Sequence, residues 1–174
     1  YPIVSLVGYT NAGKSTLFNR ITNAGVFAEN LLFATLDPTM RKIELPNQQE
    51  AILADTVGFI ADLPTHLIAA FRATLEQIVN ADAIVHVIDV SRDDHDAQRQ
   101  DVITILEELG VEYRRDEGVI EVLNKIDRCD PPMDASNNSI NRQEVLVSAH
   151  TGEGVDFLLS KIATITARGR EALH

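Results

Sequence analysis

The sequence predicts an α/β fold in which helices cover both faces of a mostly parallel six-stranded sheet. Short apolar segments rich in valine and isoleucine alternate with segments of helical periodicity along most of the 174 residues. Most of the strand-like segments are largely apolar, as strands are when both faces of a parallel sheet are covered. A glycine-rich loop directly follows the first of these strands, and strands and helices then alternate to the end of the chain.

The length and composition are those of one packed domain. The chain has 45% apolar and 24% charged residues, close to globular averages, so disorder is excluded as its main state. We expect residues 1–174 to form a single domain excised from a longer protein, because the chain starts at Tyr1 rather than at methionine. We expect no membrane span, because no apolar run approaches the required length. We expect no secretion signal, because no N-terminal stretch pairs basic residues with an apolar core. The single cysteine, Cys129, suits a reducing cytoplasm.

Five segments make up the first part of the pattern. Residues 3–8 are a β-branched run that ends in glycine, and they predict a buried strand. Apolar side chains in residues 14–22 recur at i and i+4, which predicts a helix. Residues 24–38 have no sustained periodicity and predict a long loop, a kind of segment that is usually functional. Residues 41–45 and 51–54 predict two strands that a turn joins into a hairpin.

The second part of the pattern contains three helices and three strands. The first helix follows Pro64, and its apolar residues up to Val79 lie on one face. The second contains the apolar residues of 102–109 and ends at a glycine, and the third runs through residues 157–165. Residues 130–143, with two prolines and a Ser/Asn cluster, predict an excursion into solvent. The strands are predicted at residues 83–88, 119–123 and 145–147.

A phosphate-binding loop is predicted at residues 8–15, which fit the pattern Gly-x-x-x-x-Gly-Lys-Ser in full. The two glycines allow backbone angles at which successive N–H groups point at phosphate oxygens, and the N-terminus of the following helix adds partial positive charge. We expect Lys14 to reach the outer phosphates and the Ser15 hydroxyl to bind Mg²⁺. The candidate contacts are Gly8, Tyr9, Thr10, Asn11, Ala12, Gly13, Lys14, Ser15 and Thr16.

A second candidate motif, Asp-x-x-Gly, closes the predicted third strand. A carboxylate at the C-terminal end of a strand faces the ligand crevice of an open α/β sheet. We therefore expect Asp55 to hold the metal through water and the Gly58 N–H to contact a γ-phosphate; Thr56 and Val57 lie between them. Such a motif is common in turns and gains weight here from the phosphate loop that precedes it.

A third motif, Asn-Lys-x-Asp, follows the predicted fifth strand and points to a guanine base. The Asp127 carboxylate only accepts hydrogen bonds, which matches the two adjacent donors on the Watson–Crick edge of guanine. Adenine presents an acceptor there, so the motif selects GTP over ATP. We expect Asn124 to tie this loop to the phosphate loop, and the Lys125 stem to lie over the base. After the last strand, Ser148-Ala149 is positioned to offer a backbone N–H to the guanine carbonyl.

Four motifs in this order, each at a strand end, resemble those of the translation-factor-type GTPase superfamily, and the resemblance covers nearly the whole chain. Finer details resemble the GTPase domain of the HflX family. They are Tyr9-Thr10-Asn11-Ala12, Phe33-Ala34-Thr35-Leu36-Asp37-Pro38-Thr39, Asp55-Thr56-Val57-Gly58-Phe59, Leu63-Pro64 and Ala69-Ala70-Phe71.

The resemblance implies further roles. Thr35 is the candidate for the loop threonine that completes the Mg²⁺ shell beside Ser15 and Asp55, and Thr39 is the competing candidate. It also implies that GTP and Mg²⁺ order residues 30–40 and 56–64, and that hydrolysis releases them. The candidate nucleotide contacts from the loop are Phe33, Ala34, Thr35, Leu36 and Asp37, and His150 borders the base. The candidate catalytic residues are Lys14, Thr35 and Gly58.

The resemblance implies a partner as well. HflX proteins act with the large ribosomal subunit, in splitting or rescuing stalled ribosomes under stress, and full-length members carry an N-terminal domain that is absent from this sequence. We therefore expect a cytoplasmic GTP-binding switch. The alternative is a module that senses nucleotide occupancy, with hydrolysis incidental. A metabolic nucleotide kinase would share the phosphate loop but has no use for Asn-Lys-x-Asp.

Phe59 stands where many GTPases have the glutamine that positions the attacking water. A phenyl ring can neither orient nor polarise water, so we expect slow hydrolysis by the chain alone, at roughly 10⁻⁴ to 10⁻² s⁻¹. Asn11 leaves two roles open. Some related GTPases with asparagine at this position bind K⁺ beside the phosphates, whereas Asn11 can equally serve only to brace the loop.

The net charge of −11 argues against a broad nucleic-acid surface. The charge is uneven, because residues 1–80 carry a net charge of −2 and residues 81–174 a net charge of −9. The first half is therefore the better candidate face for any polyanion. We expect no direct DNA binding, and nothing in the sequence suggests more than a monomer.

Overall fold

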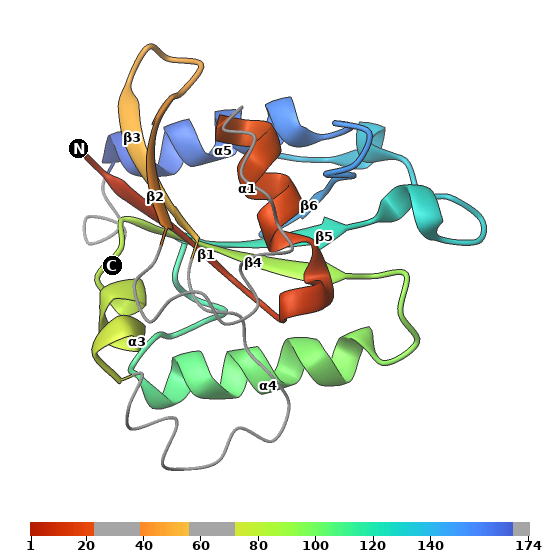
Figure 1. Cartoon of the computed structure of the whole chain (residues 1–174), viewed down its shortest axis with the longest axis horizontal. Coiled ribbons are helices and arrows are strands. Elements are labelled where there is room, and N and C mark those ends of the chain that lie inside the picture. The colour runs from red at the N-terminus through yellow and green to blue at the C-terminus, as the bar shows by residue number, and fades with distance from the viewer. Residues whose placement is uncertain (23–38, 56–71, 169–174) are drawn as a thin grey trace.

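A computed structural model describes residues 1–22, 39–55 and 72–168 of the chain. Six strands form one sheet, with helices on both of its faces (Figure 1). The strands are β1 (Ile3–Val7), β2 (Thr39–Glu44), β3 (Glu50–Asp55), β4 (Ala83–Asp89), β5 (Val119–Asn124) and β6 (Glu144–Leu146). The helices are α1 (Lys14–Thr22), α3 (Arg72–Val79), α4 (His95–Glu108) and α5 (Val155–Arg168). Short 3₁₀ turns lie at η1 (Thr10–Ala12), η3 (Ile126–Arg128) and η4 (Ala135–Asn137).

The strand order is β2-β3-β1-β4-β5-β6, and only β2 runs antiparallel to its neighbour. The prediction of a mostly parallel sheet with one hairpin is therefore confirmed. In Figure 1, α1 and α5 lie on one face of the sheet and α3 and α4 on the other. Strand β1 lies between β3 and β4, so the strand order reverses at β1: β2 and β3 lie on one side of it, and β4, β5 and β6 on the other. In open α/β sheets the C-terminal ends of the strands at such a reversal are where ligands bind.

The core lies between the sheet and the helices on its two faces. All seven residues of β4 are buried, as are the last four of β1, which is why these segments are mostly apolar and do not alternate with exposed polar residues. On the helices, one apolar face is buried, as Val102, Ile103 and Leu106 of α4 show. The largest side chains without solvent contact include Leu6, Leu17, Leu53, Ile84, Leu106, Ile120, Leu158 and Ile162.

The structure differs from the sequence pattern mainly at the ends of elements. Helix α4 begins at His95, several residues before its first buried residue, Val102, because polar and small side chains form its exposed first turns. Residues 130–143 form the predicted excursion and are mostly exposed. The Asn138 side chain fixes that segment, since it accepts from the Leu146 N–H at 2.7 Å and donates to the Leu146 carbonyl at 3.0 Å. None of the helices described is long and apolar enough to cross a bilayer.

A buried polar cluster joins α4 to the middle of the sheet. His86 of β4 and Glu121 of β5 are register partners, and both are almost fully buried. The Tyr113 hydroxyl donates to Glu121 Oε1 at 2.9 Å and lies 2.6 Å from His86 Nδ1, while Arg99 of α4 forms an ion pair with the same carboxylate. Burial, and then the neighbouring Glu121 charge, raise the pKa of Tyr113, so the hydroxyl stays protonated and can donate.

His86 makes the stability of the protein depend on pH. Burial, and then the nearby Arg99 charge, lower the pKa of His86 from 6.5 to about 3, so the ring is neutral in the folded protein. The unfolded chain binds a proton below pH 6.5 and the folded chain does not, so stability is complete above that pH and falls as the pH decreases toward 3. Between pH 7 and pH 5 this residue alone should lower the free energy of unfolding by about 2 kcal/mol.

Urea unfolding at pH 7, 6 and 5 measures this effect. The His86→Gln variant is the control, because its side chain does not titrate, and its stability should depend on pH less steeply by that amount. An equal pH dependence in the two proteins would show that His86 is not the group responsible.

Candidate nucleotide-binding site

The predicted phosphate loop connects β1 to α1 and has the backbone that its two glycines require. Gly8 has φ of 145° and Gly13 has φ of 97°, and helix α1 starts directly afterwards at Lys14. A Cβ at Gly8 would lie 2.5 Å from the carbonyl oxygen of Val87, and one at Gly13 would lie 2.3 Å from Asn124 Nδ2. Neither position has room for a side chain, so both the backbone angle and the close approach of neighbouring loops require glycine.

Lys14 and Asp55 meet at the C-terminal edge of the sheet. Strands β1 and β3 are neighbours, with Leu6 paired to Asp55, so the carboxylate lies beside the start of the phosphate loop. Lys14 Nζ lies 2.9 Å from Asp55 Oδ1, and both side chains are more than nine-tenths buried. At this depth each charge needs a partner, and here the two compensate each other. An anionic phosphate entering the loop would compete with Asp55 for the ammonium group.

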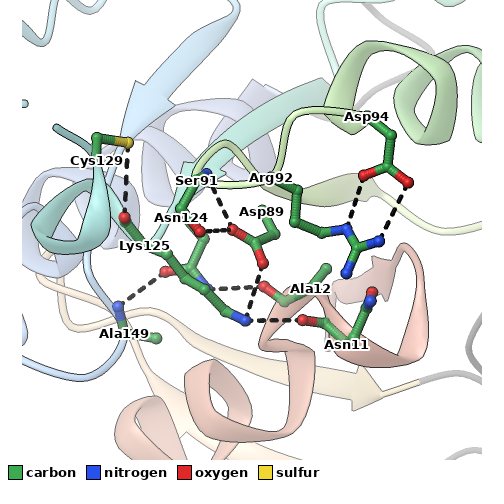
Figure 2. Close-up of polar contacts among 10 residues, drawn as sticks. All are labelled: Asn11, Ala12, Asp89, Ser91, Arg92, Asp94, Asn124, Lys125, Cys129 and Ala149. Atoms are coloured by element: carbon green, nitrogen blue, oxygen red, sulfur yellow. Dashed lines mark hydrogen bonds and ion pairs between the residues drawn. The ribbon is translucent and has the colours of Figure 1, made fainter.

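The predicted base-recognition loop is tied directly to the phosphate loop. Asn124, almost fully buried at the end of β5, donates from Nδ2 to the Ala12 carbonyl at 2.9 Å and accepts at Oδ1 from the Ala149 N–H at 2.9 Å (Figure 2). One amide side chain therefore connects three loops that follow β1, β5 and β6. The Ala149 N–H, which we expected to be offered to the guanine carbonyl, donates to Asn124 in this structure.

Lys125 makes a second connection, and its partner Asp89 was missed in the sequence. Its ammonium lies 2.9 Å from the Asn11 carbonyl oxygen and 3.0 Å from Asp89 Oδ2, at the end of β4 (Figure 2). The other Asp89 oxygen accepts from the Ser91 N–H at 3.0 Å and from the Ser91 hydroxyl at 2.5 Å. Partial burial raises the pKa of Asp89, but Ser91 and Lys125 lower it by more, so the net shift is downward. The available signal was an aspartate at the end of a buried strand, at the edge of the sheet where the other motifs lie.

Removing the Asp89 charge should weaken nucleotide binding without unfolding the protein. In Asp89→Asn the side chain keeps its size, but Lys125 loses its ion pair and with it the position of its stem. We expect the affinity for GDP to fall about tenfold, or ~1.4 kcal/mol, in a fluorescence titration with labelled GDP.

Two further variants test whether Asp89 acts through its ion pair with Lys125. Asp94→Asn breaks a carboxylate–arginine pair that is exposed to solvent, with Arg92, and should leave GDP affinity unchanged. In Lys125→Met, adding Asp89→Asn should cause little further loss, because the interaction is already gone. Additive losses in the double variant would mean that Asp89 does not act through Lys125.

Asp127 lies in η3 with its Oδ1 accepting from the Ser148 hydroxyl at 2.9 Å. The same hydroxyl accepts from the Thr151 N–H at 3.1 Å, so Ser148 holds the carboxylate and the following turn in place together.

Arg20, at the end of α1, was also missed in the sequence. It donates to the carbonyl oxygens of Ala149 at 2.5 Å and His150 at 2.6 Å, and so fixes the loop after β6 to the first helix.

The remaining described candidates lie in or next to the phosphate loop, or at the start of β2 beside Asp55. Ser15 and Thr16 lie in the first turn of α1, and Thr39 begins β2 opposite Asp55. The Tyr9 hydroxyl donates to Asp101 Oδ2 at 2.6 Å, which connects the phosphate loop to α4. Thr10 lies in η1. Several candidates lie outside the described residues: Phe33, Ala34, Thr35, Leu36, Asp37, Thr56, Val57, Gly58 and Phe59.

The Cys129 thiol lies beside this polar network but is not in a reactive form. Its Sγ lies 3.8 Å from the Lys125 carbonyl oxygen (Figure 2). Burial, and then the nearby negative charges of Asp89 and Asp127, raise the pKa of the thiol. A thiol that stays protonated is a poor nucleophile, so Cys129 is better suited to a structural role than to a reactive one.

The donor atoms near Lys14 suit magnesium. Mg²⁺ prefers hard oxygen ligands and keeps several waters. The chain offers the Ser15 hydroxyl at the start of α1 and the Asp55 carboxylate, which the ion pair with Lys14 places next to the phosphate loop. These residues fit a magnesium ion that is held mainly by substrate phosphates and water.

Comparison with solved structures defines the class of protein. The fold matches that of a GTP-binding protein from Sulfolobus solfataricus in complex with GDP, with a TM-score of 0.72 and 27% identity, over 96% of this chain and 53% of that one. It also matches the fold of a variant of Aquifex aeolicus Era bound to GDP.AlF4-, with a TM-score of 0.65 and 23% identity, over 94% of this chain and 56% of that one. The chain has the P-loop GTPase fold, as predicted.

The particular family follows from the sequence. Residues 3–125 match the model of the 50S ribosome-binding GTPases, and the chain belongs to that family. It is 48% identical over 165 residues to GTPase HflX of Magnetococcus marinus, covering 95% of this chain and 38% of that protein. It is 46% identical over 177 residues to GTPase HflX of Escherichia coli, covering 99% of this chain and 40% of that protein. The resemblance to the HflX GTPase domain is confirmed, and the chain spans about two fifths of the length of these relatives.

Proposed function

We propose that this chain binds GTP with Mg²⁺ in the cytoplasm, hydrolyses it slowly, and uses the bound nucleotide to control contact with the large ribosomal subunit. The observation that carries the proposal is the connection of three loops through Asn124 and Lys125. That connection holds a guanine-type recognition loop at a fixed position relative to a phosphate loop. Splitting or rescue of stalled ribosomes is the role that the HflX resemblance suggests for the longer protein.

Base recognition is assigned to Asp127. Its carboxylate accepts the two adjacent N–H donors of guanine, and Ser148 holds one of its oxygens in place. Asn124 keeps the loop against Ala12, so that base and phosphates are bound at a set spacing. ATP is rejected because adenine would leave the carboxylate facing an acceptor.

The Asp127→Asn variant tests base recognition. Its amide N–H would face the carbonyl that xanthine carries in place of the guanine amino group. We expect GDP affinity to fall at least a hundredfold, by about 2.7 kcal/mol, while affinity for xanthosine diphosphate rises. Asp130→Asn, which removes an exposed carboxylate three residues later, is the control and should bind GDP normally. An unchanged preference for guanine in Asp127→Asn would contradict the assignment.

Phosphate handling is assigned to the phosphate loop, Lys14 and the magnesium ligands. In the proposed cycle the γ-phosphate takes over Lys14 from Asp55, and Asp55 turns to the water shell of the metal. Ser15 and a loop threonine, Thr35 or Thr39, would supply the protein oxygens. Bound Mg²⁺ would neutralise the charge that develops between the β- and γ-phosphates. The Gly58 N–H is the proposed contact for the γ-phosphate.

The large ribosomal subunit is proposed to accelerate a slow reaction. The Phe59 side chain cannot orient the attacking water, so we expect a hydrolysis rate of about 10⁻⁴ to 10⁻² s⁻¹ for the chain alone. With purified large subunits in KCl we expect a rise of tenfold or more, or ~1.4 kcal/mol off the barrier. Small subunits are the control. A rate that large subunits leave unchanged would contradict the proposal that the activating contact lies within these 174 residues.

A potassium ion beside Asn11 is part of the same proposal. Asn11 is exposed, and among the described residues its side chain has no hydrogen-bond partner, since the Lys125 contact uses its backbone carbonyl. The side-chain oxygen therefore remains available to a cation near the phosphates. We expect hydrolysis to be several-fold faster in KCl than in NaCl at equal ionic strength, and Asn11→Ala to remove the difference. Equal rates in the two salts would favour a bracing role.

A further inference from the structure

A polar hollow lies at the opposite end of the sheet from the nucleotide-binding site. Its volume is about 440 Å³, and it is bounded by the start of β5, the segment before β6 and the last turns of α5. These are the N-terminal ends of the two parallel strands, whereas the nucleotide-binding site lies at their C-terminal ends. In Figure 1, α5 ends on the side of the sheet from which β4 and β5 start.

Four basic residues line this hollow in a chain whose net charge is −11: Arg114, Arg142, Lys161 and Arg168. Within the described part of the chain, the three arginine side chains have no ion pair or hydrogen bond, and all three are exposed. Other basic side chains are already engaged, as Lys14, Lys42, Arg92, Arg99 and Lys125 are by carboxylates. Three guanidinium groups without such a partner thus lie around one depression, beside the ammonium of Lys161.

Lys161 is a buried lining residue whose position is fixed by hydrogen bonds. Its side chain is 6% exposed, and its ammonium donates to the Ile140 carbonyl at 3.1 Å and to the Arg142 carbonyl. These bonds fix the segment that carries Arg142 against α5. An ammonium has three N–H donors, so one remains for a ligand in the hollow.

Carboxylates offset only part of this charge. Asp116 is buried, and its carboxylate accepts from the Gly118 N–H of its own turn at 2.9 Å. Glu117 lines the hollow and is exposed, and Glu144 lies near Lys161. The lining residues have four positive charges and two negative ones, which leaves a local positive field on an acidic protein.

We propose that this hollow, defined by Arg114, Arg142, Lys161 and Arg168, is a docking site for RNA phosphates of the large ribosomal subunit. The inference rests on the proposed function, which supplies an RNA-rich partner. Guanidinium groups bind phosphate oxygens in pairs through a planar fork, and a phosphodiester fits the volume. The hollow lies in the more acidic half of the chain, residues 81–174, and not in the half that the charge totals favoured for a polyanion. Because the surroundings are acidic, such a local basic site would fix how the protein is oriented on RNA.

Binding to large subunits at several KCl concentrations tests the proposal. The 174-residue chain, loaded with a non-hydrolysable GTP analogue, is sedimented with purified subunits between about 50 and 200 mM salt. We compare it with the triple variant Arg114→Gln, Arg142→Gln, Arg168→Gln. The matched control is Arg41→Gln, Arg92→Gln, Arg115→Gln, which removes the same charge from three exposed arginines off the hollow.

We expect the hollow variant to bind at least tenfold more weakly than the control. Its slope of log K against log salt should be lower by about 0.7–0.9 for each phosphate that the variant no longer binds. Affinity for the GTP analogue should be unchanged in both variants, since the nucleotide-binding site lies at the other end of the sheet. Ultraviolet crosslinking of the bound chain should then yield RNA-linked peptides that contain Arg114 or Arg142.

Three results would overturn the proposal. Equal weakening of the two variants would mean that only total charge matters, and the proposed function would stand. A protein-linked peptide at the hollow, in place of an RNA-linked one, would assign the site to an acidic ribosomal protein. If the unaltered chain does not sediment with large subunits at any salt concentration, the proposed ribosome contact itself fails for this chain.

Discussion

Replacing Gly13 with alanine is expected to reduce GDP affinity at least a hundredfold, by about 2.7 kcal/mol. Gly13 has φ of 97°, where a side chain is strained by about 1–2 kcal/mol. Its added Cβ would also lie 2.3 Å from Asn124 Nδ2. Asn124 would have to move, and it would give up its bonds to Ala12 and Ala149. The phosphate loop and the base-recognition loop would then lose their fixed spacing.

Gly110→Ala is the matched control for this variant. Gly110 has φ of 100°, nearly the same as Gly13, but nothing lies within 4 Å of the position that its Cβ would take. It should lose stability by about 1–2 kcal/mol from backbone strain alone and bind GDP normally. Isothermal titration with GDP and a thermal melt of each variant separate the two effects. Normal GDP binding by Gly13→Ala would show that the contact with Asn124 does not hold the site together.

Replacing Arg99 with methionine is expected to lower the free energy of unfolding by about 3 kcal/mol. Glu121 is 2% exposed, and Arg99 supplies its compensating charge from α4. Methionine fills much the same space but leaves the carboxylate unpaired in the core, beside Tyr113 and the neutral His86. The penalty is mainly that of an uncompensated buried charge.

Arg92→Met is the control, because it removes an arginine from a pair that is exposed to solvent, with Asp94, and should cost at most about 1 kcal/mol. Adding Glu121→Gln to Arg99→Met should recover part of the lost stability, since the neutral amide no longer needs a counter-charge. Urea unfolding measures all four proteins. If the second substitution lowered stability further, the unpaired charge would not be the cause of the loss.

The polar contacts at the C-terminal edge of the sheet form a connected set. Asn124, Lys125 and Asp89 join the ends of β4 and β5 to the phosphate loop, and Tyr9 joins that loop to α4. A nucleotide that displaces Asp55 from Lys14 would therefore act on a structure in which the neighbouring loops already have fixed positions. Under the proposed function this arrangement would suit a switch, because a change at the γ-phosphate would leave the base-recognition loop in place.

Much of this protein was predictable because its strongest signals are local. The phosphate loop needs glycines at two positions, and both have the positive φ that the pattern implies. The nearly continuous apolar run of residues 83–88 predicted a buried strand, and β4 is buried along its whole length. The proposed recognition of guanine by Asn124, Lys125 and Asp127 also came from residue type, because a carboxylate disfavours adenine by chemistry alone.

The partners of these residues could be found only in the tertiary structure. Asn124 meets Ala12 across 112 residues, and Arg20 meets Ala149 across 129. The ion pair of Asp89 with Lys125, the cluster around Glu121 and the basic hollow beside α5 likewise join segments from separate strands and helices. The sequence determined the class of fold and the chemistry of the nucleotide site, through short-range pattern and residue type. Tertiary structure decided which side chains hold that site in place, because the strand order sets those contacts and no local pattern encodes the strand order.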